Sequence, residues 1–250
     1  MDKKTIGLIL LTVLVLLEAV DLTGTFDRPD YSPEKTEVVL RPNLIYSSGN
    51  VLVFDDFESP TLKGWVAGTV GYAATLSTAK AFTGSGSMSL TAGTTSPYYS
   101  GIHKYYGMPP SQKQGVQFVW NSSTTALKYV YIHTEGMTIT NWYIAKVRYD
   151  YVEGKWEYAT GAATWADIPG AAQAQAVTAH DWHFIKLVVD YSTGKFIRLY
   201  SDADSWDMSS LSMYDAGVTV SKRLSLVIRN YSQDNTQPVM YIDDLAITEE

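Results

Sequence analysis

Carboxylates gather near both ends of the stretch from residue 51 to residue 250, and they are the side chains best suited to hold a metal ion. They are Asp55, Asp56 and Glu58 near its start and Asp243 and Asp244 near its end. A hard cation such as calcium takes about six to eight oxygen ligands and would relieve the repulsion among such groups. A structural Ca2+ site is therefore predicted if the two ends meet in the fold. The alternative is a set of solvated charges at strand ends, paired with Lys or Arg.

Residues arranged for catalysis are not found. Glycoside hydrolases need two carboxylates, one acting as an acid and the other as a nucleophile or base, but Glu153 and Glu157 flank a predicted hairpin turn without a second acid at the required alternation. The histidines are scattered, without the spacing of a metal motif; they are His103, His133, His180 and His183. No Gly-Lys-Ser phosphate loop and no Gly-x-Ser-x-Gly element occurs. The sequence therefore predicts that this protein is not an enzyme.

Aromatic side chains suggest a binding surface instead. Tyr129, Tyr131 and His133 alternate on one predicted strand, while Trp142, Lys146 and Arg148 share a side of another. If these strands are neighbours, their rings and hydrogen-bond donors form a platform on which a sugar can stack. We therefore predict a glycan-binding site formed by Tyr129, Tyr131, His133, Trp142 and Arg148. The alternative is that the same rings form a protein–protein contact surface.

The elements that would position these residues are short strands separated by turn residues, which is typical of a β-sandwich. The predicted strands are Val51–Phe57, Thr69–Ser77, Ser87–Thr91, Tyr98–Tyr106, Val116–Trp120, Tyr129–Thr134, Trp142–Tyr151, Trp156–Tyr158, Trp182–Asp190, Phe196–Ser201, Arg223–Tyr231 and Val239–Thr248. Alternation along three of them predicts an aliphatic core face. Its members are Val130, Ile132, Ile197, Leu199, Leu224, Leu226 and Ile228. No long helical period appears after residue 50.

Four segments carry a resemblance to a known fold. Asp181–Asp202 (DWHFIKLVVDYSTGKFIRLYSD) resembles paired strands of laminin-G and concanavalin-like proteins. Phe54–Ser59, Thr83–Leu90 and Val239–Thr248 resemble the start, middle and end of jelly-roll carbohydrate-binding modules. The resemblance implies an all-β, antiparallel jelly-roll β-sandwich over residues 51–250. It also implies neighbouring first and last strands, which would bring the carboxylates together, and related modules commonly hold calcium there.

Composition limits the function further. Apolar residues make up 46% of the chain and charged residues 18%, so the chain can bury a substantial core. The net charge of −7, without a Lys/Arg stripe, argues against nucleic acid as a partner. The chain has no cysteine, which excludes disulfides, thiolate metal sites and a cysteine nucleophile.

The first fifty residues differ from the rest. Ile6–Leu17 is almost wholly apolar but shorter than the roughly 20 residues of a membrane-spanning helix. Residues 1–20 are thus predicted to be a signal, a membrane anchor touching lipid at residues 6–20, or an assembly segment. Residues 21–50 contain prolines at positions 29, 33 and 42, which favour an extended arm or linker over a helix.

Two hypotheses follow. The first is a non-catalytic structural protein of an assembly, such as a virion decoration, spike or tail component or a surface layer. It would dock on other subunits through residues 1–50. The second is a secreted or membrane-tethered carbohydrate-binding module. Both predict an extracellular or virion-surface location.

Overall fold

The computed structural model describes residues 50–67, 74–94, 99–122, 124, 126–138, 140–175, 181–217, 223–233 and 237–250. The predicted apolar segment (1–20) and nearly all of the predicted arm (21–50) lie outside the described residues. Within the described ranges, no helix is long and apolar enough to cross a membrane.

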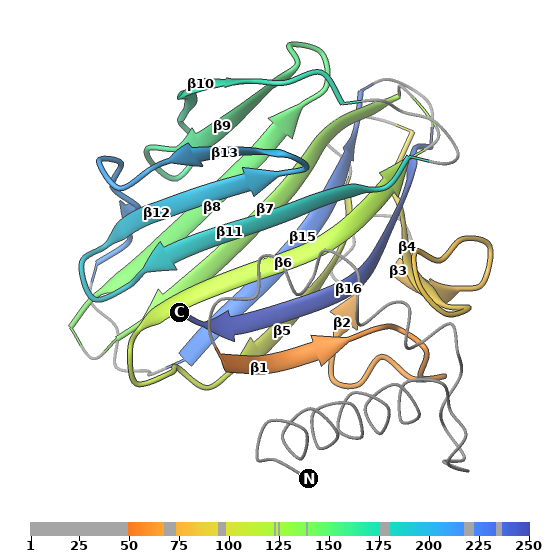
Figure 1. The fold of residues 1–250 in the computed structure, drawn as a ribbon, viewed down its shortest axis with the longest axis horizontal. Coiled ribbons are helices and arrows are strands. Elements are labelled where there is room, and N and C mark those ends of the chain that lie inside the picture. Colours follow the sequence, from red (N-terminus) through yellow and green to blue (C-terminus); the bar gives the residue numbers. More distant parts are fainter. Residues whose placement is uncertain are drawn as a thin grey trace, which may run out of the picture. The chain divides into compact units, whose positions relative to one another are not determined.

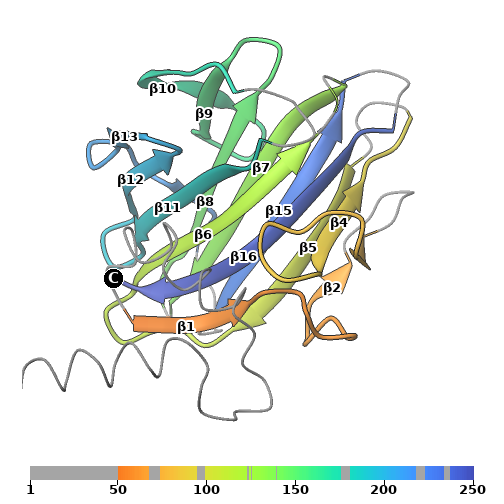
Figure 2. The same ribbon diagram turned by 45° about the vertical axis from the view of Figure 1, so that its right-hand side comes forward.

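Two eight-stranded sheets make up the described part of the chain (Figure 1). The first sheet has the order β13-β12-β11-β6-β16-β4-β3, with β1 also paired to β16. Its strands are β1 (Asn50–Asp55), β3 (Ala74–Ser77), β4 (Ser87–Thr91), β6 (Lys113–Ser122), β11 (His183–Asp190), β12 (Lys195–Ser201), β13 (Asp204–Asp207) and β16 (Val239–Glu249). Figure 2 shows β11, β6 and β16 running side by side across it.

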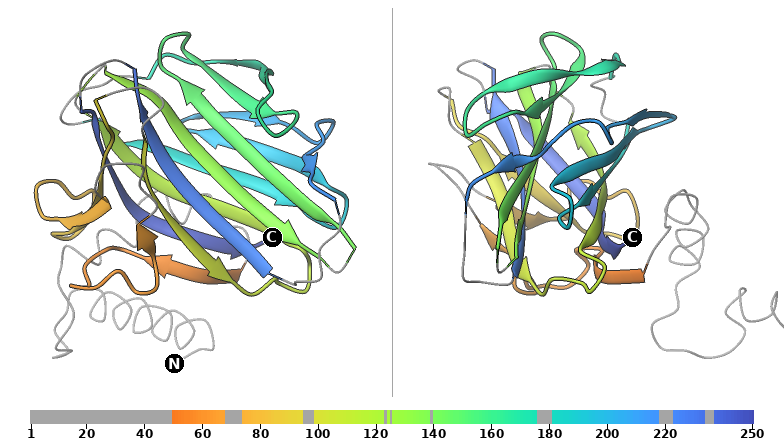
Figure 3. Two further views of the ribbon diagram at one scale, coloured as in Figure 1. Left: turned by 180° about the vertical axis from the view of Figure 1, so that it is seen from behind. Right: turned by 90° about the vertical axis from the view of Figure 1, so that its left-hand side faces the viewer.

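The second sheet has the order β10-β9-β8-β7-β15-β5-β2, with β14 also paired to β8. Its strands are β2 (Val66–Ala67), β5 (Tyr99–Tyr106), β7 (Leu127–Met137), β8 (Trp142–Asp150), β9 (Lys155–Ala159), β10 (Trp165–Ala172), β14 (Tyr214–Asp215) and β15 (Arg223–Ser232). Seen from behind, β8, β7 and β15 lie next to one another (Figure 3). Every pairing between these strands is antiparallel, which confirms the predicted all-β, antiparallel sandwich.

The core lies between the two sheets. Strand side chains alternate between two faces, so each strand contributes every second residue to it. Val130 and Ile132 of β7 are fully buried there, as are Leu224, Leu226 and Ile228 of β15. These are the predicted core residues, and their burial leaves the alternate side chains of both strands on the outer face of the second sheet.

Strand β12 departs from the predicted alternation. Phe196 and Leu199 are fully buried in the core, whereas Ile197 is only half-buried. The cause is a break in register between Val188 and Val189 of β11, where β12 carries an additional residue. The prediction that Ile197 joins Leu199 in the core was therefore wrong.

Strand β10 was not predicted. It contains Pro169, which cannot donate a ladder hydrogen bond, and it is rich in small residues. Because β10 is the edge strand of its sheet, the missing donor is tolerated. Its register with β9 breaks between Asp167 and Ala172, and this strand places Trp165 opposite Ala159.

Candidate glycan-binding site

The predicted platform requires β7 and β8 to be neighbours, and they are. Tyr131 lies opposite Arg148, and His133 lies opposite Lys146. All four alternate with buried core residues, so they share the outer face of the second sheet. The antiparallel register thus brings a ring and a guanidinium together from positions 17 residues apart in the chain.

A pocket of about 460 Å³ opens on this face. Strands β7, β8 and β15 form its floor, and the β9–β10 hairpin supplies one wall through Ala162, Ala163 and Trp165. The side chains of the lining are mainly rings and cations. The rings are Tyr129, Tyr131, Trp165 and Tyr231, and the cations are Lys128, Lys146, Arg148 and Arg229.

Arg148 is held between two of these rings. Its guanidinium carbon lies 4.1 Å from the ring centroids of both Tyr129 and Trp165. Its Nε also donates a 2.6 Å hydrogen bond to Oε2 of Glu157 on β9. Ring contacts on both faces and a charge-assisted hydrogen bond fix this side chain at the pocket.

Arg229 of β15 also lines the pocket and also lies near two rings. Its guanidinium carbon lies 4.2 Å from the centroid of Tyr99 and 5.6 Å from that of Tyr131. The Tyr231 centroid lies 5.3 Å from that of Tyr99 and 5.8 Å from that of Tyr131. Rings and guanidinium groups from β5, β15, β7, β8 and β10 therefore contact one another across the sheet, and these contacts limit their motion.

His133 and Trp142 lie beside the pocket rather than in its lining. Nε2 of His133 lies 2.7 Å from Oε1 of Glu135, and Nε1 of Trp142 donates a 3.3 Å hydrogen bond to Oε2 of the same carboxylate. Burial lowers the pKa of His133, although Glu135 opposes that shift. Tyr129, Tyr131 and Arg148 thus line the pocket, and the other two predicted residues adjoin it through Glu135.

The predicted site did not include Arg229 of β15, Lys128 at the start of β7, or two of the rings, Trp165 and Tyr231. Trp165 belongs to the unpredicted strand β10, so no strand assignment was available to place it. Arg229 and Tyr231 occupy the outer-face positions of a strand that was predicted correctly. They were missed because β15 is far from β7 in the sequence, so the pairing of these two strands could not be inferred from alternation. The strand order of a jelly roll would have predicted that pairing.

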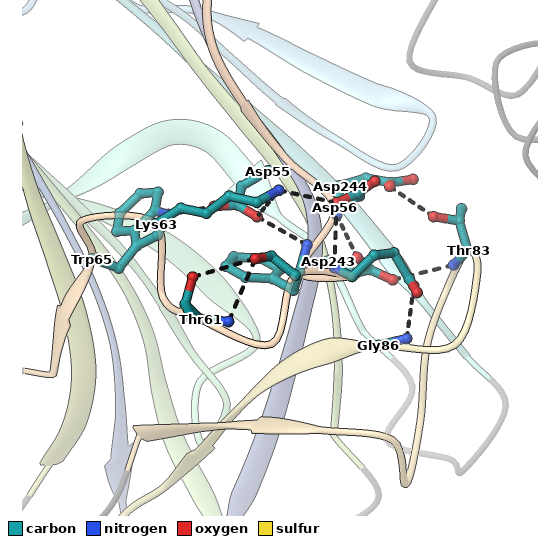
Figure 4. A network of polar contacts seen from close by, with 12 residues as sticks. Asp55, Asp56, Thr61, Lys63, Trp65, Thr83, Gly86, Asp243 and Asp244 are labelled. Atoms are coloured by element: carbon teal, nitrogen blue, oxygen red, sulfur yellow. Dashed lines mark hydrogen bonds and ion pairs between the residues drawn. The ribbon is translucent and has the colours of Figure 1, made fainter. Parts of the chain in front are cut away.

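The predicted metal ligands meet at another place in the fold (Figure 4). Strand β1 pairs with β16, and Asp55 lies opposite Leu245, the residue after Asp244. The two acidic ends therefore come together, as the resemblance implied. We call Asp55, Asp56, Glu58, Asp243 and Asp244 the acidic cluster.

Donors from the chain itself contact both oxygens of Asp243 and one oxygen of Asp244. Oδ2 of Asp243 accepts hydrogen bonds from the backbone N–H groups of Phe82 (2.8 Å) and Thr83 (3.1 Å). Its Oδ1 accepts one from the N–H of Asp244 (2.8 Å). The Thr83 hydroxyl donates to Oδ1 of Asp244 at 2.8 Å. Burial and the neighbouring Asp244 raise the pKa of Asp243 to about 8.

The other members are engaged in the same way. Glu58 accepts hydrogen bonds from the backbone N–H groups of Ser85 (2.6 Å) and Gly86 (2.7 Å). Asp55 accepts a 2.9 Å hydrogen bond from Nε1 of Trp65. Nζ of Lys63 lies 3.8 Å from a carboxylate oxygen of Asp55 and 3.7 Å from one of Asp56. A cation needs several oxygens that face it, whereas most oxygens of the cluster already face N–H groups, hydroxyls or a lysine.

Among the described residues, no group of three or more histidines and carboxylates is arranged to hold a metal ion. The cluster as it stands does not fit a calcium site, and its contacts fit the fastening of loops to the last strand. Calcium binding stays an untested prediction.

Comparisons with known proteins place the fold. No family model matches the chain, and no curated protein matches it in sequence. Several solved structures match it over most of its length. An endo-β-1,4-glucuronan lyase from Trichoderma reesei superposes with a TM-score of 0.54 at 12% identity, covering 80% of this chain and 96% of the lyase. The fold is a concanavalin-like jelly roll.

Two further structures superpose equally well. A cellulose-induced protein has a TM-score of 0.54 at 14% identity, covering 79% of this chain and 97% of its own. A carbohydrate esterase of the Shiga toxin-encoding bacteriophage phi24B has a TM-score of 0.54 at 14% identity, covering 81% of this chain and all of its own. At these identities the concanavalin-like fold is what they share with the present chain.

Proposed function

We propose that this protein is a non-catalytic carbohydrate-binding module that holds a sugar in the pocket on the outer face of its second sheet. The observation that carries the proposal is the set of rings around that pocket, with two guanidinium groups fixed among them. Aromatic rings present flat apolar faces to a pyranose, and fixed donors can read its hydroxyl groups. A pocket of about 460 Å³ has the size of a small-ligand site.

The charges around the pocket support binding rather than hydrolysis. Among the described residues of the lining there is no carboxylate. Two carboxylates on neighbouring strands are engaged with other side chains, since Glu157 accepts a hydrogen bond from Arg148 and Glu135 lies against His133. Hydrolysis by the usual pair of carboxylates needs both of them facing the glycosidic bond.

The assembly role, which the sequence favoured first, depends on residues 1–50, nearly all of them outside the described part of the chain. The carbohydrate-binding alternative has the better support, because rings and donors form its site among described residues. The two roles are compatible, because many copies on one particle would strengthen a weak sugar site. Both suit an extracellular or virion-surface protein.

A glycan array probed with the purified chain tests the proposal. Trp165→Ala and Tyr129→Ala should each weaken binding by about tenfold or more, as expected when a ring that contacts the ligand is removed. Tyr105→Ala is the matched control, because Tyr105 is 55% exposed on β5 of the same sheet and does not line the pocket. Equal binding by all three variants would show that the sugar binds elsewhere.

A second assay tests the absence of catalysis. The chain is incubated with each glycan that binds, and the products are analysed for new reducing ends, unsaturated sugars and released acyl groups. We expect none. The glucuronan lyase and the phage esterase share the fold, so these three products are the relevant ones to measure. Turnover that is lost in the Tyr131→Phe variant would contradict the proposal and show that the pocket is catalytic.

A further inference from the structure

Positive charge is concentrated in the pocket. Its lining contains four cationic side chains, Lys128, Lys146, Arg148 and Arg229, and no Asp or Glu among the described residues. The whole chain carries a net charge of −7. The pocket thus has the opposite sign to the protein around it, and opposite local charge concentrates ligands of the complementary sign.

Only one of these cations has a carboxylate partner among the described residues. Nε of Arg148 donates to Glu157 at 2.6 Å. Lys146 donates a 3.2 Å hydrogen bond to the carbonyl oxygen of Ala162, a neutral acceptor. Burial lowers the pKa of Lys146, and the positive charge of Arg229 acts in the same direction against the opposing effect of Glu135. An anion placed between Lys146 and Arg229 would relieve that repulsion.

Arg229 also has a donor without an acceptor. Its Nε is buried and has no hydrogen-bond partner among the described residues. Buried donors nearly always find an acceptor in the protein, in water or in a ligand. The guanidinium is meanwhile held against Tyr99 and Tyr131, so its position is fixed before any ligand arrives. A planar fork of this kind matches the paired oxygens of a carboxylate or sulfate group.

We infer that the ligand of this pocket is an anionic glycan, whose uronate carboxylates or sulfate esters pair with Arg229 and Lys146 while its rings stack on the aromatic lining. This inference rests on the proposed carbohydrate-binding function and adds the charge of the sugar. Nucleic acid is the weaker match, because the cations are confined to one pocket on an acidic chain rather than spread along a groove.

The first experiment compares polymers that differ in charge alone. Isothermal titration calorimetry is run with polygalacturonate and its carboxyl-reduced form, with dextran sulfate and dextran, and with single-stranded DNA. We expect one or both anionic glycans to bind about ten- to a hundredfold more tightly than their neutral partners, as charge-assisted hydrogen bonds do over neutral contacts. The preference should shrink as salt is raised, because salt screens exposed charge. The two anionic arms separate carboxylate from sulfate.

The second experiment locates the charge effect. Arg229→Gln and Lys146→Met should each reduce the anionic preference by about tenfold. Lys113→Met is the matched control, because Lys113 is an exposed lysine at the start of β6 in the other sheet. Arg229→Lys keeps the charge but not the fork, so it should recover only part of the affinity. Thermal melting of each variant confirms that it is folded.

Each outcome decides between the two levels of the proposal. Equal affinity for charged and neutral partners would overturn the charge inference and leave the proposed function standing. An absence of binding in every glycan arm would remove both. DNA binding tighter than that of every glycan would overturn the inference in favour of a nucleic-acid site.

Discussion

The acidic cluster and the pocket both gather like charges from distant parts of the chain. They differ in their partners: the carboxylates of the cluster contact donors from the chain, whereas most cations of the pocket have no carboxylate partner among the described residues. In the acidic cluster, backbone N–H groups, two hydroxyls, an indole and a lysine already contact carboxylate oxygens. In the pocket, Lys146 and Arg229 have no carboxylate partner among the described residues. A closed network of this kind holds a fold together, whereas an open one leaves donors for a ligand. Charge clustering alone does not separate the two cases, because the donors that close a network come mostly from the backbone.

The largest expected effect is on stability at the acidic cluster. Asp243→Ala would leave the N–H groups of Phe82, Thr83 and Asp244 without their acceptor, at a cost of about 3–5 kcal/mol in the free energy of unfolding. Urea denaturation measures it. Asp207→Ala is the control, because this exposed carboxylate accepts a single backbone hydrogen bond from Ser209. A similar cost for both variants would contradict a special role for the cluster.

The next effect should appear in both stability and binding. Arg148→Met removes the partner of the mostly buried Glu157 and should lower the free energy of unfolding by about 1–3 kcal/mol, and it should also weaken glycan binding. Adding Glu157→Gln removes the unpaired charge, so stability should recover while binding stays weak. Recovery of both properties in the double variant would mean that Arg148 contributes to the fold and not to the site.

A smaller effect concerns pH. Burial lowers the pKa of His133 below its ordinary value of 6.5, so the unfolded chain takes up this proton before the folded chain does. The stability that neutral His133 contributes is present above pH 6.5 and is lost as the pH falls toward the lowered pKa. In His133→Asn, the free energy of unfolding should therefore decline less between neutral and mildly acidic pH. Parallel pH profiles for the two proteins would show that folding does not lower the pKa of His133.

The smallest effect expected is that of a chelator. A ligand bound only by the folded state raises the melting temperature by mass action. Because the oxygens of the acidic cluster already accept hydrogen bonds, EDTA should leave the melting temperature unchanged. A fall that added calcium reverses would establish the calcium site that the sequence predicts.

Much of the fold could be predicted from alternation, since side chains that point inward must be apolar whatever their partner strand. Val130, Ile132 and Leu226 were placed correctly on that basis. Ile197 was placed wrongly in the core. An additional residue in β12 shifts which side chains point inward, and no local sequence pattern marks such a bulge. Strand β10 was missed for a different reason. Pro169 and its small neighbours are untypical of a central strand, but an edge strand tolerates them.

The site was predictable only where its residues share a strand or adjoining strands. Tyr129, Tyr131 and Arg148 were found because β7 and β8 follow each other in the chain. Arg229 and Trp165 reach the same pocket from β15 and β10, through pairings and packing that alternation does not determine. The predicted meeting of the two acidic ends followed from the neighbouring first and last strands, whereas the backbone N–H groups that contact Asp243 and Glu58 come from a loop whose path no sequence pattern determines.

The tip of the β9–β10 hairpin, Thr160–Thr164, has a consequence for how such a protein can change. It is tied to the sandwich by the hydrogen bond from Lys146 to Ala162, and the tip contributes no residue to the hydrophobic core. Its ends are joined by hydrogen bonds between Thr160 and Thr164, so the strands beneath it close without it. Loops of other lengths could be exchanged at this position, each giving the pocket a new wall on an unaltered frame. If the pocket binds a glycan as proposed, its selectivity for chain length or branching can evolve, or be engineered, separately from folding.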